Sequence, residues 1–166
     1  MGSKRTRRLA VSALLLAVML VLGYIESLIP SGAVPGIKLG LSNSVLILAI
    51  IWLGIPNAFV LMFGKVLLSG LLFGGVSAMM FSLAGGVVSM LVMCLLYKLK
   101  FGTTAVAIAG AVAHNVGQVG LAMMILETDR LVYYMAVLML VGLVTGFVTG
   151  TLARILDRRL PDGLKP

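Results

Sequence analysis

Two long segments without a charged residue constrain this chain more than any other feature of its sequence. They cover Leu39–Gly64 and Val66–Tyr97, and a single residue, Lys65, separates them. Only 11% of the 166 residues are charged, whereas soluble domains carry about 25%. Because no soluble core of this length could bury such segments, the sequence predicts an integral membrane protein.

Six apolar segments approach the roughly 20 residues that a transmembrane helix needs. Proline and glycine end the first three, at Pro30, at Gly54-Ile55-Pro56 and at Gly74-Gly75. We therefore predict an all-α integral membrane protein in which residues 1–166 form a single domain of six transmembrane helices. The expected helices are Leu9–Ile29, Ile37–Leu53, Asn57–Phe73, Ser77–Tyr97, Thr103–Leu126 and Leu131–Leu156.

The start of the chain also resembles a signal peptide, because basic residues between Lys4 and Arg8 precede an apolar run. That run continues for about twenty residues, and no small-x-small cleavage site closes it. We expect an uncleaved first helix.

Basic residues are unevenly divided between the two sides of the predicted bundle. One side receives the basic tails, about residues 1–8 and 157–166, together with Lys98 and Lys100, while the loops of the other side carry only Lys38 and Arg130. Since Lys and Arg accumulate in cytoplasmic segments, both termini are predicted to be cytoplasmic. The net charge of +8 therefore indicates membrane flanks rather than a nucleic-acid partner.

Lys65 lies near the middle of its predicted span, Asn57–Phe73. A lysine at the centre of a bilayer costs about 2.5–3.5 kcal/mol on insertion scales and is kept mainly where it faces a polar cavity or partner. Two alternatives are that Lys65 snorkels to the interface and that it forms a structural ion pair with Glu26. Its central depth favours a pocket.

The fifth predicted helix carries a second polar group. His114 and Gln118 are four residues apart and share a face, Asn115 flanks them, and Gly110 and Gly117 leave space beside them. A lone polar residue in a membrane helix commonly serves as an interhelical hydrogen bond. Three within five residues favour a binding site.

The remaining polar residues of the predicted helices lie in the middle and outer parts of the bundle. A pocket that opens to the outside and receives a ligand with an anionic or strongly polar head would explain this distribution. The candidate binding residues are Lys65, His114, Asn115, Gln118, Ser69, Asn43, Glu26 and Lys38.

Small residues on the first and last helices indicate contacts between helices. Ala10, Ala13 and Ala17 form a narrow stripe on the first helix, and Glu26 points to the opposite face. This stripe is either an interface for another protein or a packing face inside the monomer. In the last helix, Gly142, Gly146 and Gly150 predict close packing against a neighbouring helix.

Several kinds of catalytic chemistry lack their residues in this sequence. There is no Walker A loop, no aspartate-rich DDxxD pair and no HExxH, and His114 is the only histidine. We therefore expect no enzyme, no metal site and no cofactor in this chain, and any ATP would be used by a partner. A channel or proton-coupled carrier would need a titratable relay through the whole bilayer, and the inner half of the predicted bundle has none.

Five short stretches together resemble one bacterial membrane family, the heptaprenyl diphosphate synthase component I family, also called the Gx transporter family. The stretches are Gly23–Glu26, Pro35–Asn43, Leu71–Gly74, Ser82–Gly86 and Gly110–Gln118. That family in turn is similar to the substrate-binding S components of energy-coupling factor (ECF) transporters, which are six-helix proteins of the bacterial cell membrane.

The resemblance implies two different functions. As an S component, the chain would bind a small polar or anionic nutrient, or a quinone or isoprenoid precursor, from outside. It would pair with a membrane coupling protein and two ATPases, and the Ala-x-x-x-Ala element of the family matches Ala13 and Ala17. As a synthase component, it would be a non-catalytic membrane partner of a prenyl diphosphate synthase.

Overall fold

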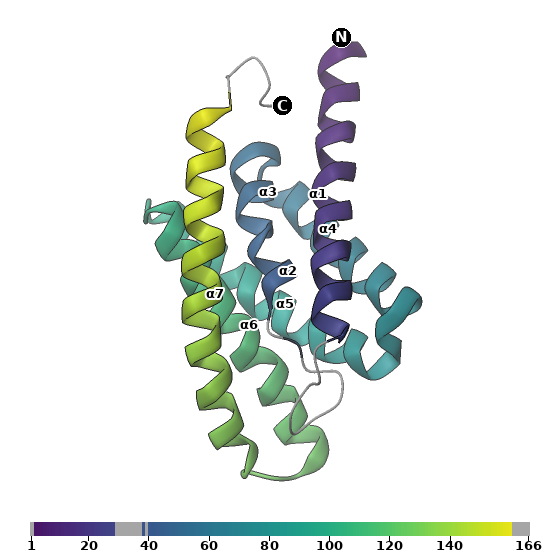
Figure 1. Cartoon of the computed structure of the whole chain (residues 1–166), viewed down its shortest axis with the longest axis vertical. Coiled ribbons are helices and arrows are strands. Elements are labelled where there is room, and N and C mark those ends of the chain that lie inside the picture. The colour runs from purple at the N-terminus through teal and green to yellow at the C-terminus, as the bar shows by residue number, and fades with distance from the viewer. Residues whose placement is uncertain (1, 29–37, 39, 161–166) are drawn as a thin grey trace.

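Every regular element is helical in the part of the chain that the computed structural model describes, residues 2–28, 38 and 40–160 (Figure 1). This confirms the all-α prediction. The predicted helix end at Pro30 and the motif residues Pro35–Ile37 lie outside the described residues. The elements are α1 (Gly2–Leu28), α2 (Leu41–Ser44), α3 (Leu46–Leu53), α4 (Ile55–Ser69), the π-helical turn η1 (Gly70–Gly74), α5 (Gly75–Lys98), α6 (Thr103–Leu126) and α7 (Leu131–Arg159).

Among the described residues, four helical runs are long and apolar enough to cross a membrane: Lys4–Leu28, Ile55–Lys98, Thr103–Leu126 and Leu131–Arg159. The second run is not one straight helix. Gly75 adopts a φ of 72°, which side chains other than glycine rarely tolerate, and the chain turns there from α4 and η1 into α5 (Figure 1). The predicted break at Gly74-Gly75 is confirmed, whereas the π-helical turn before it was not predicted.

The predicted helix Ile37–Leu53 is wrong at its start and in its length. Lys38 is not helical, Gly40 has a φ of 88°, and the helix begins only at Leu41. From Leu41 to Leu53 it extends about 20 Å, short of the roughly 30 Å of a hydrocarbon core. A positive φ is accessible to glycine and stops the helix from extending backwards.

The short helix α3 lies at the centre of the bundle. Leu46, Ile47 and Ala49 are completely buried, and α3 contacts α1, α4, α5, α6 and α7. A helix that is apolar on all sides needs apolar surroundings on all sides. The core of the protein is therefore organised around α3.

Glycines bring α6 and α7 into close contact, as predicted. Gly142, Gly146 and Gly150 are buried, and a Cβ at Gly146 would lie only 2.6 Å from the Cα of Ile108. Without side chains at these positions, the two backbones approach closely enough for continuous van der Waals packing. The four-residue spacing of these glycines thus determines which face of α7 packs against α6.

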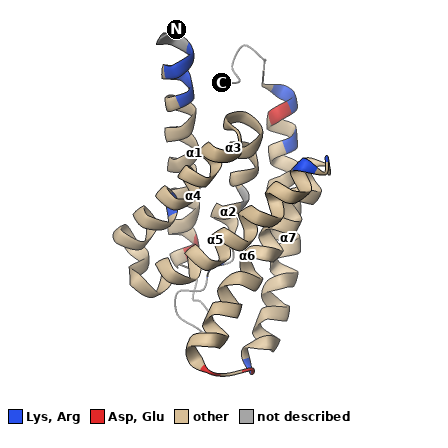
Figure 2. Ribbon diagram, turned by 180° about the vertical axis from the view of Figure 1, so that it is seen from behind, with Lys and Arg blue, Asp and Glu red and all other residues tan. Residues whose placement is uncertain are grey.

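Charged residues gather at the ends of the helices, mostly at the end that holds both termini (Figure 2). The described basic residues near the two ends belong to α1 and α7 rather than to separate tails, because α1 begins at Gly2 and α7 continues to Arg159. Lys165 lies outside the described residues. At this end Arg8 Nη2 donates a hydrogen bond to the carbonyl of Leu53 (3.3 Å), and Trp52 Nε1 donates to Asp157 (2.9 Å). These bonds tie α1 and α7 to α3.

Candidate binding site

All eight candidate binding residues are buried, with between 0 and 7% of their surface exposed. They come from α1, from the segment before α2, and from α2, α4 and α6, so the fold gathers residues that lie far apart in the sequence. We refer to seven of them as the polar cluster: Glu26, Lys38, Asn43, Lys65, His114, Asn115 and Gln118. The eighth, Ser69, donates a hydrogen bond to Val66 O of its own helix (3.2 Å), which is a local contact.

Gln118 holds the backbone of Lys38 against α6. The N–H of Lys38 donates to Gln118 Oε1 (3.2 Å), and Gln118 Nε2 donates to the carbonyl of Lys38 (2.6 Å) and to Asn115 Oδ1 (3.1 Å). Asn115 Nδ2 in turn donates to the carbonyl of Leu138 on α7 (2.6 Å). Both amide side chains were predicted to line a pocket, which stays a prediction; these bonds show that each of them holds a backbone segment in position.

A Gln118→Glu substitution is expected to lower stability. A carboxylate cannot donate, so the carbonyl of Lys38 and Asn115 Oδ1 would both lose a partner, and each unsatisfied buried group costs about 1–3 kcal/mol. Thermal unfolding of the purified protein in detergent measures the loss, and Glu127→Gln on the exposed turn after α6 serves as the control. An unchanged midpoint would show that the pairing of Gln118 with Lys38 contributes nothing.

Glu26 binds the first turn of α2. The N–H of Leu41 donates to Oε1 (2.6 Å) and the hydroxyl of Ser42 donates to Oε2 (3.1 Å). A carboxylate stabilises the first turn of a helix because the N–H groups there lack intrahelical partners. Each carboxylate oxygen of Glu26 therefore accepts a hydrogen bond from α2. Within the described residues, no ion pair links Glu26 to Lys65, so the predicted alternative of a structural ion pair is wrong.

The ammonium group of Lys38 faces aromatic rings. Its Nζ lies 4.9 Å from the centroid of Phe73, and the ring of Phe73 meets Tyr24 edge to face at 5.6 Å. A cation over an aromatic face is attracted by the ring quadrupole. The pKa of Lys38 is lowered, because the effect of burial is larger than the opposing effect of the Glu26 carboxylate.

Lys65 is the unpaired cation of the polar cluster. Only 2% of its surface is exposed. Within the described residues no hydrogen bond or ion pair involves it, and its Nζ is not one of the fully enclosed unbonded atoms. The snorkelling alternative does not fit this burial, because a snorkelling ammonium group extends into the interface.

Two further groups of the polar cluster are incompletely bonded. Asn43 Nδ2 donates to Ser89 Oγ (2.7 Å), but Asn43 Oδ1 has no partner among the described residues. His114 Nδ1 lies beside the backbone of Gly85, where a Cβ would be 2.8 Å away, without a well-aligned hydrogen bond in the described part of the chain. Buried polar groups are normally satisfied, so these two atoms are exceptions within the described residues.

Sequence reasoning missed Ser42 and Ser89, which bind Glu26 and Asn43. Serines in apolar helices usually bond to their own helix, so nothing in the pattern distinguishes these two. It also missed Gly40, whose φ of 88° places the chain against His114: a Cβ there would lie 3.2 Å from His114 Cδ2.

The stripe of alanines on α1 lies away from the polar cluster. Ala10, Ala13 and Ala17 are exposed, whereas Glu26 on the same helix is 4% exposed. The predicted opposition of the two faces is confirmed. The alternative in which these alanines pack inside the monomer is wrong.

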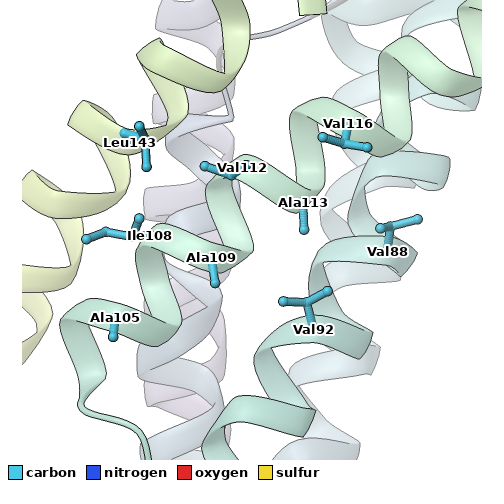
Figure 3. Close-up of a pocket in the computed structure, with 9 residues that line it drawn as sticks. All are labelled: Val88, Val92, Ala105, Ile108, Ala109, Val112, Ala113, Val116 and Leu143. Atoms are coloured by element: carbon cyan, nitrogen blue, oxygen red, sulfur yellow. The ribbon is translucent and has the colours of Figure 1, made fainter. Parts of the chain in front are cut away.

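A groove of about 610 Å³ runs along the outer face of α6 (Figure 3). Side chains of α5, α6 and α7 line it, among them Val88, Val92, Ala109, Val112 and Leu143, and all of its lining residues are apolar. Such a surface suits hydrocarbon and offers nothing to a polar ligand.

A smaller cavity of about 320 Å³ lies at the end of the bundle that holds the termini. It is lined by residues around the start of α6, including Thr103 and Thr104, and by Arg154, Asp157 and Arg158 of α7. Within the described residues, no group of three or more His, Cys, Asp or Glu side chains is arranged to hold a metal ion.

Comparison with known proteins identifies the family. Residues 15–156 match the family described as heptaprenyl diphosphate synthase component I. No curated protein and no solved structure matches the chain. The matched range begins within α1 and ends within α7, so it includes every member of the polar cluster. The chain is therefore a member of the heptaprenyl diphosphate synthase component I family.

Proposed function

We propose that this chain is the substrate-binding S subunit of an ECF-type importer in a bacterial cell membrane. Six segments cross or enter the membrane in this proposal: α1, α2 with α3, α4 with η1, α5, α6 and α7. Both termini face the cytoplasm, because the basic ends of α1 and α7 and the basic turn after α5 would otherwise violate the positive-inside rule. Partner ATPases would use the ATP.

The unpaired Lys65 carries the proposal. A charged side chain in an apolar interior is costly, and a protein with a purely architectural role gains nothing from keeping one without a partner. A subunit that captures a polar or anionic ligand does gain, since the ligand supplies the missing partner. Lys65, Asn43 and His114 would contact the ligand, while Gln118, Asn115 and Glu26 hold the segment around Lys38 and α2 in place.

The exposed alanine stripe supports a membrane partner. A helix face of small residues allows another helix to approach closely, and Ala10, Ala13 and Ala17 leave such a face uncovered on α1. In the proposal this face binds the coupling protein. Because the polar cluster lies on the opposite side of α1, ligand and partner would not compete.

A double substitution, Ala13→Leu with Ala17→Leu, is expected to abolish transport and co-purification with the coupling protein while leaving ligand binding intact. Bulky side chains would keep the partner helix from close contact, and the polar cluster would be untouched. Ala136→Leu, at an exposed alanine of α7, is the matched control. Pull-down of the assembled complex and native mass spectrometry of the purified subunit measure the two effects; loss of ligand with normal assembly would contradict the assignment.

The family description favours a second candidate function. The words "component I" of a heptaprenyl diphosphate synthase describe one part of a complex, so the chain would be the non-catalytic membrane partner of a prenyl diphosphate synthase. This candidate predicts co-purification with a soluble subunit that has aspartate-rich motifs. Co-purification with ATPases and a coupling protein instead would favour the importer.

A further inference from the structure

We propose that the polar cluster is selective for a ligand whose buried end carries one negative charge and, beside it, one hydrogen-bond donor. A hydroxy-substituted monocarboxylate has this chemistry, whereas a diphosphate does not. The inference rests on the proposed binding function and specifies its ligand class.

The charge balance of the polar cluster gives the ligand charge. Lys38 and Lys65 contribute two positive charges and Glu26 contributes one negative charge, and all three side chains are at most 7% exposed. The segment from Ile29 to Ile37, and Leu39, contain no ionisable side chain, so the connection between α1 and α2 adds nothing to the balance. One excess positive charge remains in the interior.

A ligand with one negative charge neutralises this excess. A ligand with two or three negative charges would leave unpaired negative charge in the interior, which is penalised by the same loss of hydration. Charge matching therefore favours a monoanion over phosphomonoesters and diphosphates.

The contacts of the three ions place the anionic group at Lys65. Both oxygens of Glu26 bind α2, and the ammonium group of Lys38 lies over Phe73. Lys65 alone among the three has no such contact with a described residue. It also has the deepest burial of the three, at 2% exposure.

Asn43 supplies the second part of the specificity. Its Nδ2 is bonded to Ser89, so the unbonded atom, Oδ1, is an acceptor and requires a donor from the ligand. Ser89 lies one turn from Gly85 on α5, and Gly85 faces His114. Asn43 and His114 thus contact the same face of α5. In this inference the ligand lies between that face and Lys65 of α4.

Four small molecules test the ligand class on the full chain, washed free of ligand and placed in lipid nanodiscs at constant ionic strength. Lactate is the hydroxy monoanion, propionate lacks its hydroxyl, lactamide lacks its charge, and inorganic diphosphate carries excess charge. We expect saturable increases of the unfolding midpoint with lactate, at least fivefold weaker apparent binding of propionate, and no saturable effect of lactamide or diphosphate. In an Asn43→Leu variant, lactate and propionate should bind equally.

The outcomes separate this inference from the proposed function. If lactamide protects as well as lactate does, or if only diphosphate protects, the inferred ligand class is wrong. The proposed binding function would still stand, because a small molecule binds in either case. If none of the four molecules protects, a second measurement is needed. Native mass spectrometry of the protein before washing identifies the molecule that it retains from purification. A retained molecule with a single negative charge supports the inference, and one with any other charge overturns it. No protection and no retained molecule overturn both.

Discussion

Replacing Lys65 by methionine is expected to weaken ligand binding more than about a hundredfold. Removing one member of a buried charge pair costs about 3–5 kcal/mol, and each 1.4 kcal/mol corresponds to about a factor of ten in affinity. Methionine keeps the length and apolar stem of the side chain, so packing around α4 is preserved. Native mass spectrometry of the purified protein should then detect no retained ligand.

The same substitution should stabilise the ligand-free protein. Lys65 has no described partner when the ligand is absent, and replacing buried charges by apolar side chains is neutral or stabilising by about 1–4 kcal/mol. Thermal unfolding of the ligand-free variant measures this gain, with Lys98→Met, an exposed lysine at the end of α5, as the control. Lower stability together with unchanged ligand retention would assign Lys65 a structural role.

Gly85→Ala is expected to destabilise the protein by about 1–3 kcal/mol, the usual cost of overpacking a tight interior. A Cβ at Gly85 would lie 2.6 Å from the carbonyl oxygen of His114 and 2.8 Å from its Nδ1. The carbonyl belongs to the backbone of α6 and cannot move alone, so α5 and α6 must separate. The separation would displace His114 and weaken ligand retention as well.

Gly86→Ala is the matched control for this prediction. A Cβ at Gly86 would meet only the side chain of Met62, with the sulfur 2.9 Å away, and methionine side chains adapt readily to small changes in volume. Unfolding midpoints of the two variants in the same detergent should therefore differ clearly. Equal midpoints would show that the approach of α5 to α6 at Gly85 has no energetic importance.

The sequence predicted the long helices well because hydropathy and helix-ending residues act locally. Both ends of α6 and the start of α7 coincide with their predicted positions, since a glycine precedes α6 and charged residues lie between the two helices. The helix at Leu41–Leu53 was predicted too long. Hydropathy does not distinguish a helix that faces lipid from one that is enclosed by protein, and only the contacts of α3 show that it is enclosed.

For the candidate site, the sequence indicated which residues are buried but not what each one binds. Central polar residues such as Lys65 and His114 must be enclosed because lipid is costly for them. Their partners depend on tertiary contacts between distant segments. Gln118 bonds to a residue 80 positions away, and no local pattern contains that information.

The pairing between Gln118 and Lys38 involves only the backbone of residue 38. Any amino acid except proline could form the same two bonds, because each of the others has an N–H and a carbonyl group. The side chain at this position can therefore change during evolution without loosening the segment that α6 holds. Related proteins could alter the charge and shape of the region around Phe73 by a single substitution while the segment keeps its place against α6.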